Sequence, residues 1–366
     1  MSVVRGWCPT AHRPMAAGDG LLVRVRPRLA HMTRLQVIGL AEAAADHGNG
    51  AIDVTNRANL QIRGVREDRW ASLIAALCAL ELVDTDPGLE AKRTMLVAPD
   101  WQEGDDTHRI ASDLTARLSE LPELPGKFGF AIDAGAAPLL REAPADIRIE
   151  RDSIGGLILR ADGRTGGMPL SDGAEVDAVI ALAHWFVASG GSAAGRMARH
   201  IAPLPAWADR ESFPSPAGVA IATGPHPLGA VVGLPFGRIE AAGLARLVAD
   251  GGGIRVTPWR RLIVEGSTAT EQPEPALLHT DACVGAPACP QASVATRDLA
   301  RCLAPHVEGQ LHVSGCAKGC ARARPAHVVL TGRDGRFDLA IAARAGDPPV
   351  LSGLDAAQIL ARFGAA

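Results

Sequence analysis

Two residue types are nearly missing from the 366-residue chain, which has no tyrosine and only three lysines: Lys92, Lys127 and Lys318. Without a phenol, the chain cannot use tyrosine as an acid, a base or a radical. An excess of either charge is missing too, since 37 basic and 40 acidic residues leave a formal charge of −3. This balance argues against a non-specific nucleic-acid-binding protein, which needs a basic excess.

The sequence also lacks a long apolar run. Its longest stretch, residues 178–188, contains His184 and is too short to span a bilayer. The N-terminal segment MSVVRGWCPTAHRPM has no apolar core of the kind that a signal peptide needs. We therefore expect a cytoplasmic protein without membrane contact, whose seven cysteines are reduced thiols. A hydrophobic content of 47% allows a large core and excludes a disordered chain.

An internal repeat of four elements is present. The first copy has a predicted strand at 20–27, a helix at 33–47 that Gly48 ends, and strands at 51–55 and 60–65. The second copy has a strand at 229–236, a helix at 239–250, and strands at 254–257 and 262–264. The segments TNRANLQIRG and TPWRRLIVEG hold the same place in each copy. We expect the two β-α-β-β units to pair into one sheet with helices on one side, the alternative being chance similarity.

The remaining segments predict further α+β domains. Helices are expected near 110–118 and 174–189, strands near 128–133 and 156–160, a hairpin from HVVLTG and FDLAIAA, and a last helix at 354–363. The proline-rich stretch 203–216 predicts a linker between halves, and the duplication would then include both halves. The expected domains are residues 1–90, 91–210, 211–275 and 276–366.

Four cysteines form two pairs, Cys283-x5-Cys289 and Cys316-x3-Cys320, among small residues and prolines. Such a set fits a [4Fe–4S] cluster, which needs four thiolates and nearby backbone N–H groups. Glycines at 285, 315 and 319 would permit that approach, because they carry no side chain. The cations of Lys318, Arg322 and Arg324 would offset the negative charge of the cluster and its ligands.

Three alternatives to the cluster remain at this point. Structural zinc also uses four cysteines, although its pairs are usually closer in sequence. Isolated buried thiols are a second alternative, and Cys78 has that character. A catalytic thiol pair is the third. Cys302 is either a bystander or a spare ligand.

The cysteine spacing resembles that of the nitrite and sulfite reductase superfamily, whose members carry a [4Fe–4S] cluster beside a tetrapyrrole. The repeated β-α-β-β units resemble its duplicated ferredoxin-like half-domains, which accompany two α/β domains of the reductase type. Within it, GNGAIDVTNRANLQIRG and SGCAKGC are most similar to the precorrin-3B synthase family of aerobic cobalamin biosynthesis. The resemblance covers nearly the whole chain.

A turn rich in cations would bind the acetate and propionate groups at the edge of such a tetrapyrrole. Arg57, Asn59, Gln61 and Arg63 alternate along the chain, so they can share one sheet face and bind carboxylates. A solvated basic edge strand is the alternative on pattern alone. The resemblance favours the binding role.

The resemblance adds two further cations to Arg57 as candidate catalytic residues: Arg93 and Lys127. Three departures from the family pattern accompany them. The segment at Arg93 reads Arg-Thr-Met for Arg-Asn-Val, Gly129 replaces the second lysine of LPxKxK, and ARARP follows Gly319-Cys320 where the family has Ala-His-Pro.

The resemblance implies a monooxygenase that binds precorrin-3A and O2, hydroxylates C20 and forms a lactone from the ring A acetate. The [4Fe–4S] cluster would relay electrons from an external donor, an NAD(P)H-dependent reductase or a ferredoxin, because no G-x-G-x-x-G opens a helix here. A further non-haem iron is conceivable, but the eleven histidines form no recognisable two-His, one-carboxylate set. Cys8 and His12 are weak candidates for it.

Two other functions stay open from the sequence. One is a sirohaem-dependent nitrite or sulfite reductase, in which Cys320 would bridge cluster and haem iron; Gly129 speaks against it. The other is a non-catalytic iron–sulfur electron-transfer protein, which would hold a cluster but no substrate.

Overall fold

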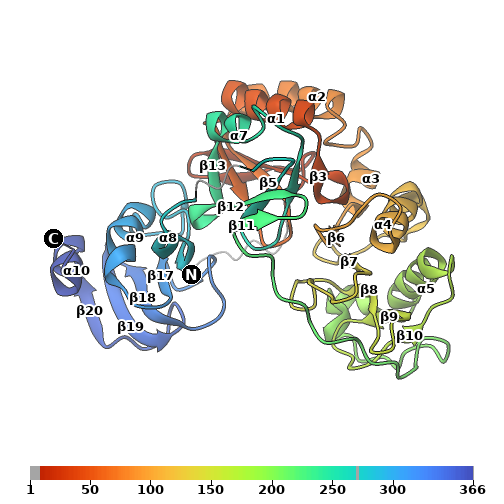
Figure 1. Ribbon diagram of the computed structural model, residues 1–366. Helices are drawn as coiled ribbons and strands as arrows, with labels where there is room; N and C mark the ends of the chain where they lie inside the picture. Colours follow the sequence, from red (N-terminus) through yellow and green to blue (C-terminus); the bar gives the residue numbers. More distant parts are fainter. Residues whose placement is uncertain (1–8, 269–271, 366) are drawn as a thin grey trace.

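The computed structural model describes residues 9–268 and 272–365, so Cys8 lies outside the described residues. Within these ranges the strands form four five-stranded sheets (Figure 1). Two sheets lie beneath helices α1 (Arg34–His47), α2 (Trp70–Ala79) and α7 (Ala241–Leu247), and the other two sheets lie lower in the view, in separate lobes. The α+β class with duplicated ferredoxin-like units is therefore confirmed.

The first repeat folds as the sequence predicts. Its elements are β2 (Gly20–Val25), β3 (His31–Met32), α1 (Arg34–His47), β4 (Ala51–Val54) and β5 (Leu60–Val65). Helix α1 begins after Thr33, whose hydroxyl accepts the Gln36 N–H while the Gln36 side chain accepts the Thr33 N–H. The short strand β3 is the one element that the periodicity did not indicate.

The second repeat has the same order: β12 (Gly229–Gly233), β13 (Arg238–Glu240), α7 (Ala241–Leu247), β14 (Ile254–Val256) and β15 (Arg261–Glu265). The predicted helix start at residue 239 was wrong, because residues 238–240 form β13 instead. In both copies a 3-10 turn with a left-handed residue precedes the short strand. Leu29 has φ 52° in the first copy and Phe236 has φ 58° in the second.

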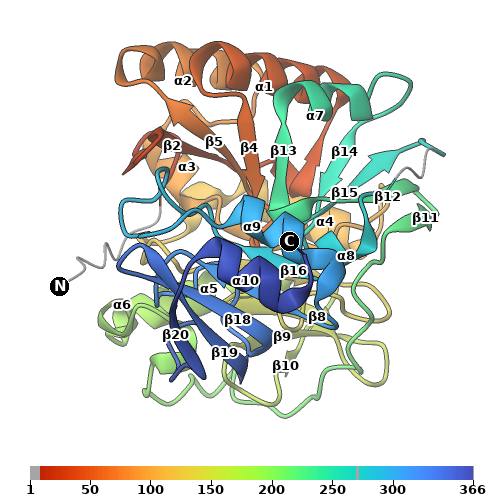
Figure 2. The same ribbon diagram turned by 90° about the vertical axis from the view of Figure 1, so that its left-hand side faces the viewer.

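Each repeat builds its own sheet and donates its short strand to the other sheet, so the expectation of one common sheet was wrong. The strand orders are β1-β2-β5-β4-β13 and β11-β12-β15-β14-β3, with β1 at Met15–Ala17 and β11 at Gly224–His226. Strand β13 lies beside β4 (Figure 2), with Arg238 opposite Asp53. In the other sheet, His31 of β3 lies opposite Arg255 of β14. A 3-10 turn directly precedes each of the two exchanged strands. The repeats share one hydrophobic core that includes Leu40 and Leu244.

The two lobes also repeat each other. In the first, β6 (Met95–Val97), β7 (Phe130–Asp133) and β8 (Ile147–Arg151) are parallel, and β9 (Leu157–Ala161) and β10 (Met168–Pro169) are antiparallel. The second lobe has the same plan in β16 (Thr280–Ala282), β17 (Leu311–Ser314), β18 (Ala326–Arg333), β19 (Arg336–Ala343) and β20 (Leu351–Leu354).

The helices of the lobes match as well: α4 (Asp106–Ala116) and α5 (Glu175–Ala188) correspond in chain order to α9 (Arg297–Leu303) and α10 (Ala356–Phe363). The duplication thus includes both halves, as the sequence suggested, and the predicted hairpin is β18–β19. Strands β6, β8, β16 and β17 were missed, because short strands that are buried on both faces show no alternation.

The remaining elements connect these units. They are the short helices α3 (Pro87–Lys92), α6 (Gly191–Ala194) and α8 (Pro275–Leu278). The predicted linker 203–216 contacts the first lobe through the bridges Asp152–Pro214 and Gly167–Ser212. The four domain boundaries stay a prediction. Among the described residues, no helix has the length and apolar character needed to cross a membrane.

Candidate functional site

A cavity of about 860 Å³ lies where the first repeat, the turn of the second repeat and the second lobe meet. This volume is at the upper end of the usual range for small-molecule sites. The apolar part of its lining includes Leu22, Val54 and Phe236. Its polar lining includes Thr55, Asn56, Gln61, Arg63, Arg260, Arg297, Lys318 and the four cysteines of the two predicted pairs.

The fold itself brings the two cysteine pairs together. Cys283 directly follows β16 and Cys316 follows β17, and these strands are parallel neighbours whose carboxyl ends share one edge. The partners Cys289 and Cys320 lie in the loops that follow. All four line the cavity and none forms a disulfide.

The surroundings of the thiols fit a cluster. The Gly315 N–H donates a hydrogen bond to Cys283 Sγ at 3.1 Å, the kind of contact that the glycine positions predicted. A Cβ at position 315 would lie 2.5 Å from the Ala292 Cβ, so only glycine brings the backbone this close. Desolvation raises the pKa of the Cys320 thiol, Lys318 lowers it, and the charges of the other three cysteines raise it. The four cysteines thus share one cavity lining and influence one another electrostatically.

Among residues 9–268 and 272–365, no three His, Cys, Asp or Glu side chains are grouped closely enough to hold a single metal ion. A four-iron cubane differs from a single-ion site in that each of its thiolates binds at a separate corner. No ligand set for a further iron emerges from the described residues, and the ring of His12 instead bonds the Asp84 carbonyl at 2.7 Å.

The structure divides the predicted cationic turn between two places. Gln61 and Arg63 line the cavity. Arg57 and Asn59 line a smaller neighbouring pocket with Gly129, where Arg57 Nη1 donates to the Lys127 carbonyl at 3.1 Å. The division arises in the turn, because Ala58 has φ 50° and regular alternation begins only at Leu60 of β5.

The other two predicted cations differ in exposure. Arg93 is buried, and its guanidinium donates to Glu90 Oε2 at 2.7 Å and to the Arg26 carbonyl at 2.6 Å, away from the cavity lining. Lys127 is exposed and meets Arg57 through its carbonyl. Lys318, which the sequence singled out beside the cluster, does line the cavity.

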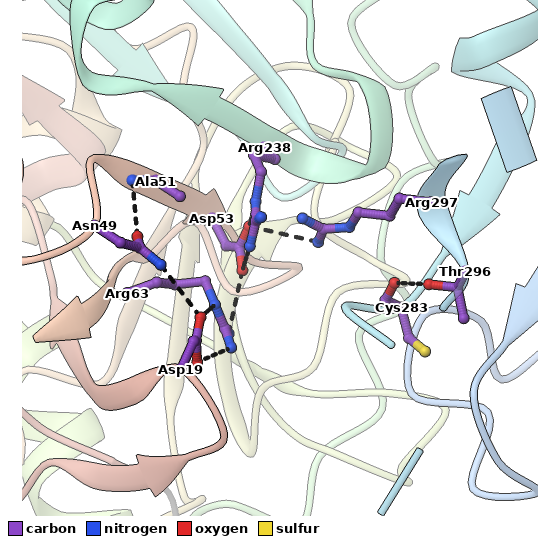
Figure 3. Close-up of polar contacts among 9 residues, drawn as sticks. All are labelled: Asp19, Asn49, Ala51, Asp53, Arg63, Arg238, Cys283, Thr296 and Arg297. Atoms are coloured by element: carbon purple, nitrogen blue, oxygen red, sulfur yellow. Dashed lines mark hydrogen bonds and ion pairs between the residues drawn. The ribbon is translucent and has the colours of Figure 1, made fainter. Parts of the chain in front are cut away.

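Sequence reasoning missed a carboxylate and two arginines beside the cavity. The Asp53 carboxylate forms ion pairs with Arg238, Arg63 and Arg297, at N···O distances of 2.8, 3.4 and 3.5 Å respectively (Figure 3). We call these four residues the Asp53 cluster. Burial raises the pKa of Asp53, but its hydrogen bond from Arg238 and the charges of the three arginines outweigh burial and lower it overall.

The repeat itself held a signal for this cluster. Where the first copy has Asp53 and Arg63, the second has Arg255 and Glu265, so the charges of the pair are inverted. Arg255 and Glu265 bond at 2.6 Å, and the Arg255 guanidinium lies 4.0 Å from the centre of the Trp101 ring. At the place where the first copy opens to the cavity, the second copy is therefore closed by the Arg255–Glu265 pair and by Trp101 of the first lobe.

Comparisons with known proteins agree with this architecture. Residues 13–80 match the family described as the nitrite/sulfite reductase ferredoxin-like half domain. A precorrin-3B synthase from Sinorhizobium sp. is 31% identical over 389 residues, which covers 93% of this chain and 83% of that protein. A ferredoxin–nitrite reductase from Synechococcus elongatus is 30% identical over 141 residues, or 35% of this chain and 27% of that protein.

A solved structure supports the fold. The NirA protein of Mycobacterium tuberculosis superposes with a TM-score of 0.60 over 90% of this chain and 76% of that one, at 16% identity. Identity this low speaks for the architecture alone. The nearly full-length similarity to the Sinorhizobium protein goes further, and it shows that the chain belongs to the precorrin-3B synthase family of the nitrite/sulfite reductase superfamily.

Proposed function

We propose that the protein converts precorrin-3A to precorrin-3B in cobalamin biosynthesis, by hydroxylating C20 and forming a lactone from the ring A acetate. One atom of O2 enters the product and the other leaves as water, which consumes two electrons and two protons. The electrons come from an external donor, an NAD(P)H-dependent reductase or a ferredoxin.

One observation carries this proposal: four cysteines line a single cavity together with cationic and amide side chains. A polycarboxylate macrocycle needs such cations, and arginine binds carboxylates with two parallel hydrogen bonds. The name of the Sinorhizobium relative supports the choice of substrate.

Cys283, Cys289, Cys316 and Cys320 would hold a [4Fe–4S] cluster, which supplies single electrons when bound. The remaining roles belong to side chains that the fold has already fixed. Asp19 holds Arg63 by two bonds of 2.8 and 2.9 Å, so its guanidinium is oriented before substrate arrives.

Two further cations line the cavity: Arg260, from the turn of the second copy, and Lys318, from the loop between two cysteines. Asp281 and the Ala321 carbonyl hold Arg260. Lys318 carries an ammonium at the cavity and is our candidate for supplying protons, since the chain has no tyrosine.

The three predicted cations that do not line the cavity would support substrate binding from outside it. Arg57, together with Lys127, would bind a peripheral carboxylate at the rim, because both lie in the turn and loop next to the cavity-lining Asn56. Arg93 would act indirectly, by holding α3 against the segment that follows β2 through Glu90 and Arg26.

Turnover with labelled oxygen tests the proposal. Anaerobically purified protein is mixed with precorrin-3A and a chemical reductant, and oxygen-18 gas is then admitted. We expect a product that is heavier by one oxygen-18 atom, and we expect none from Cys289→Ser. Absence of product from a protein whose cluster is reducible would eliminate the enzyme proposal and leave an electron-transfer role.

A sirohaem-dependent nitrite or sulfite reductase is the second candidate, favoured by the open space beside Cys320 and by the NirA-like fold. The absorption spectrum of the anaerobically purified protein separates the two. Sirohaem bands would overturn the synthase proposal, whereas a broad shoulder near roughly 400 nm, typical of thiolate-bound clusters, supports it.

A further inference from the structure

The guanidinium of Arg297 is the most poorly satisfied cation at the cavity. Arg297 is the first residue of α9, and its side chain extends toward Asp53 of the first repeat (Figure 3). Its recorded bond is from Nη2 to Asp53 Oδ1 at 3.5 Å, beyond the usual length of a charged hydrogen bond. Its Nε and Nη1 atoms are buried without a partner, and no other arginine in the described part of the chain has two such atoms.

The neighbouring charges leave this cation uncompensated. The Asp53 cluster and Asp19 bring three guanidinium groups together with two carboxylates, and both carboxylates bond the other arginines more closely. Burial lowers the pKa of Arg297 to about 10, with Asp53 opposing the change, so the side chain stays charged at neutral pH. A buried charge with unused donors is unfavourable unless a ligand completes it.

The backbone holds Arg297 next to the cysteines. Thr296, the preceding residue, donates its hydroxyl proton to the Cys283 carbonyl at 2.6 Å, so the start of α9 is tied to the loop of a proposed cluster ligand (Figure 3). Arg297 lines the cavity together with all four cysteines. An anion on its free N–H groups would therefore lie between the cysteine loop, which holds the Arg297 backbone, and Asp53, toward which the side chain extends.

The other half of the molecule provides an internal comparison. There Arg255 donates Nε to Glu265 at 2.6 Å and Nη1 to the carbonyls of Pro99 and Trp101, and its guanidinium lies over Trp101. None of its buried nitrogens is left without a partner. At the junction of one repeat and its lobe, the fold thus provides hydrogen-bond partners for the buried nitrogens of an arginine. At the other junction, two nitrogens of Arg297 have no such partner.

We propose that Arg297 binds a carboxylate side chain of the substrate macrocycle and thereby fixes which edge of the macrocycle faces the cysteines. This inference rests on the proposed function, which supplies a substrate with several carboxylates. On binding, Nη1 of Arg297 donates to one carboxylate oxygen, and Nη2, at the same end of the guanidinium, donates to the other oxygen while it keeps or gives up Asp53. Arg297 is then a positioning residue that determines orientation.

Anaerobic binding of precorrin-3A tests this assignment, because no turnover occurs without O2. The dissociation constant is measured by quenching of tryptophan fluorescence for the cluster-loaded wild type, Arg297→Gln and Arg297→Lys. The control, Arg336→Gln, changes an exposed arginine on the β18–β19 turn of the same lobe. We expect Arg297→Gln to weaken binding roughly tenfold or more, Arg297→Lys to weaken it less, and the control to bind normally.

A second readout separates binding from a structural role. Since Arg297 has unused buried donors, Arg297→Gln should leave the iron content and the substrate-free Tm unchanged or raise the Tm, while the rise in Tm that substrate causes is lost. A fall in substrate-free Tm and iron content that matches the loss of affinity would assign Arg297 a structural role and overturn the proposal. If Arg297→Gln does not fold, the affinity of Arg297→Lys decides in the same way.

The outcomes distinguish the two levels of inference. Wild-type affinity in a folded Arg297→Gln protein overturns the role of Arg297 and leaves the proposed function standing. Failure of the wild type to bind precorrin-3A overturns both.

Discussion

The Asp53→Asn substitution tests whether one carboxylate organises the cationic wall of the cavity. Asp53 is 9% exposed and is contacted by three arginines, and Arg63 and Arg297 are themselves largely buried. Removing one partner of a buried ion pair costs about 3–5 kcal/mol. The asparagine oxygen can still accept from Arg238, so we expect a loss near the lower limit, about 3 kcal/mol.

This loss converts to a measurable change in Tm. An unfolding entropy of about 2.1 cal/mol/K per residue gives about 0.8 kcal/mol/K for a chain of this length, so Tm should fall by about 4 °C. The assay is scanning fluorimetry of anaerobic, cluster-loaded protein at one fixed scan rate, because unfolding with a cofactor is often irreversible. Asp68→Asn is the matched control, since Asp68 pairs with Arg66 on the surface and should leave Tm unchanged.

The pH dependence sharpens this prediction. The folded-state pKa of Asp53 is lowered, so its stabilising contribution is complete above its ordinary pKa near 3.8 and is lost only as pH falls through the folded-state value. The Tm difference between Asp53→Asn and the wild type should therefore stay constant from about pH 5 to pH 8. A Tm within about 1 °C of the wild type would refute the idea that this carboxylate holds the arginines together.

Three further predictions address the cluster, the rim and a buried acid. Cys289→Ser should abolish the four-iron EPR signal, whereas Cys302→Ser, which alters an exposed thiol outside the cavity lining, should retain it; a persistent signal in the first variant would contradict the ligand assignment. Arg57→Ala should keep the iron content and weaken precorrin-3A binding roughly tenfold, and unchanged affinity would place the substrate elsewhere. Burial raises the pKa of Asp133 to about 7, so the wild type loses stability as pH rises from about 4 to 7; Asp133→Asn should raise Tm more at pH 8 than at pH 5, and a pH-independent difference would exclude this titration.

Much of the fold was predictable because its signals are local. The Thr33 cap, the Gly48 stop and the two-residue period of β5 all act within a few residues. The spacing within each cysteine pair is local in the same way, and the parallel strands β16 and β17 bring the two pairs to one edge of the sheet. The strand exchange was not predictable, because β3 and β13 are too short to show a period and their pairing is decided more than 180 residues away along the chain.

The candidate site was predictable only in part for a similar reason. Alternation placed Arg57 and Arg63 on one face, but the left-handed residue Ala58 interrupts the strand between them. An arginine such as Arg93 could bind a substrate carboxylate, but its guanidinium instead bonds the buried carboxylate of Glu90. Whether an arginine is free to bind depends on which carboxylates and carbonyls the fold brings beside it.

By itself, the sequence determined the duplicated α+β architecture, the four clustered thiols, and an inventory that is rich in arginine and without tyrosine. Only the tertiary structure decided which copy of the repeat opens to the cysteines. The two copies have nearly the same local pattern, but packing against the lobes differs: Trp101 covers Arg255 in one half, while Arg297 reaches Asp53 beside the cavity in the other. A buried guanidinium takes whatever anion or ring is nearest, and that neighbour is a property of the folded chain.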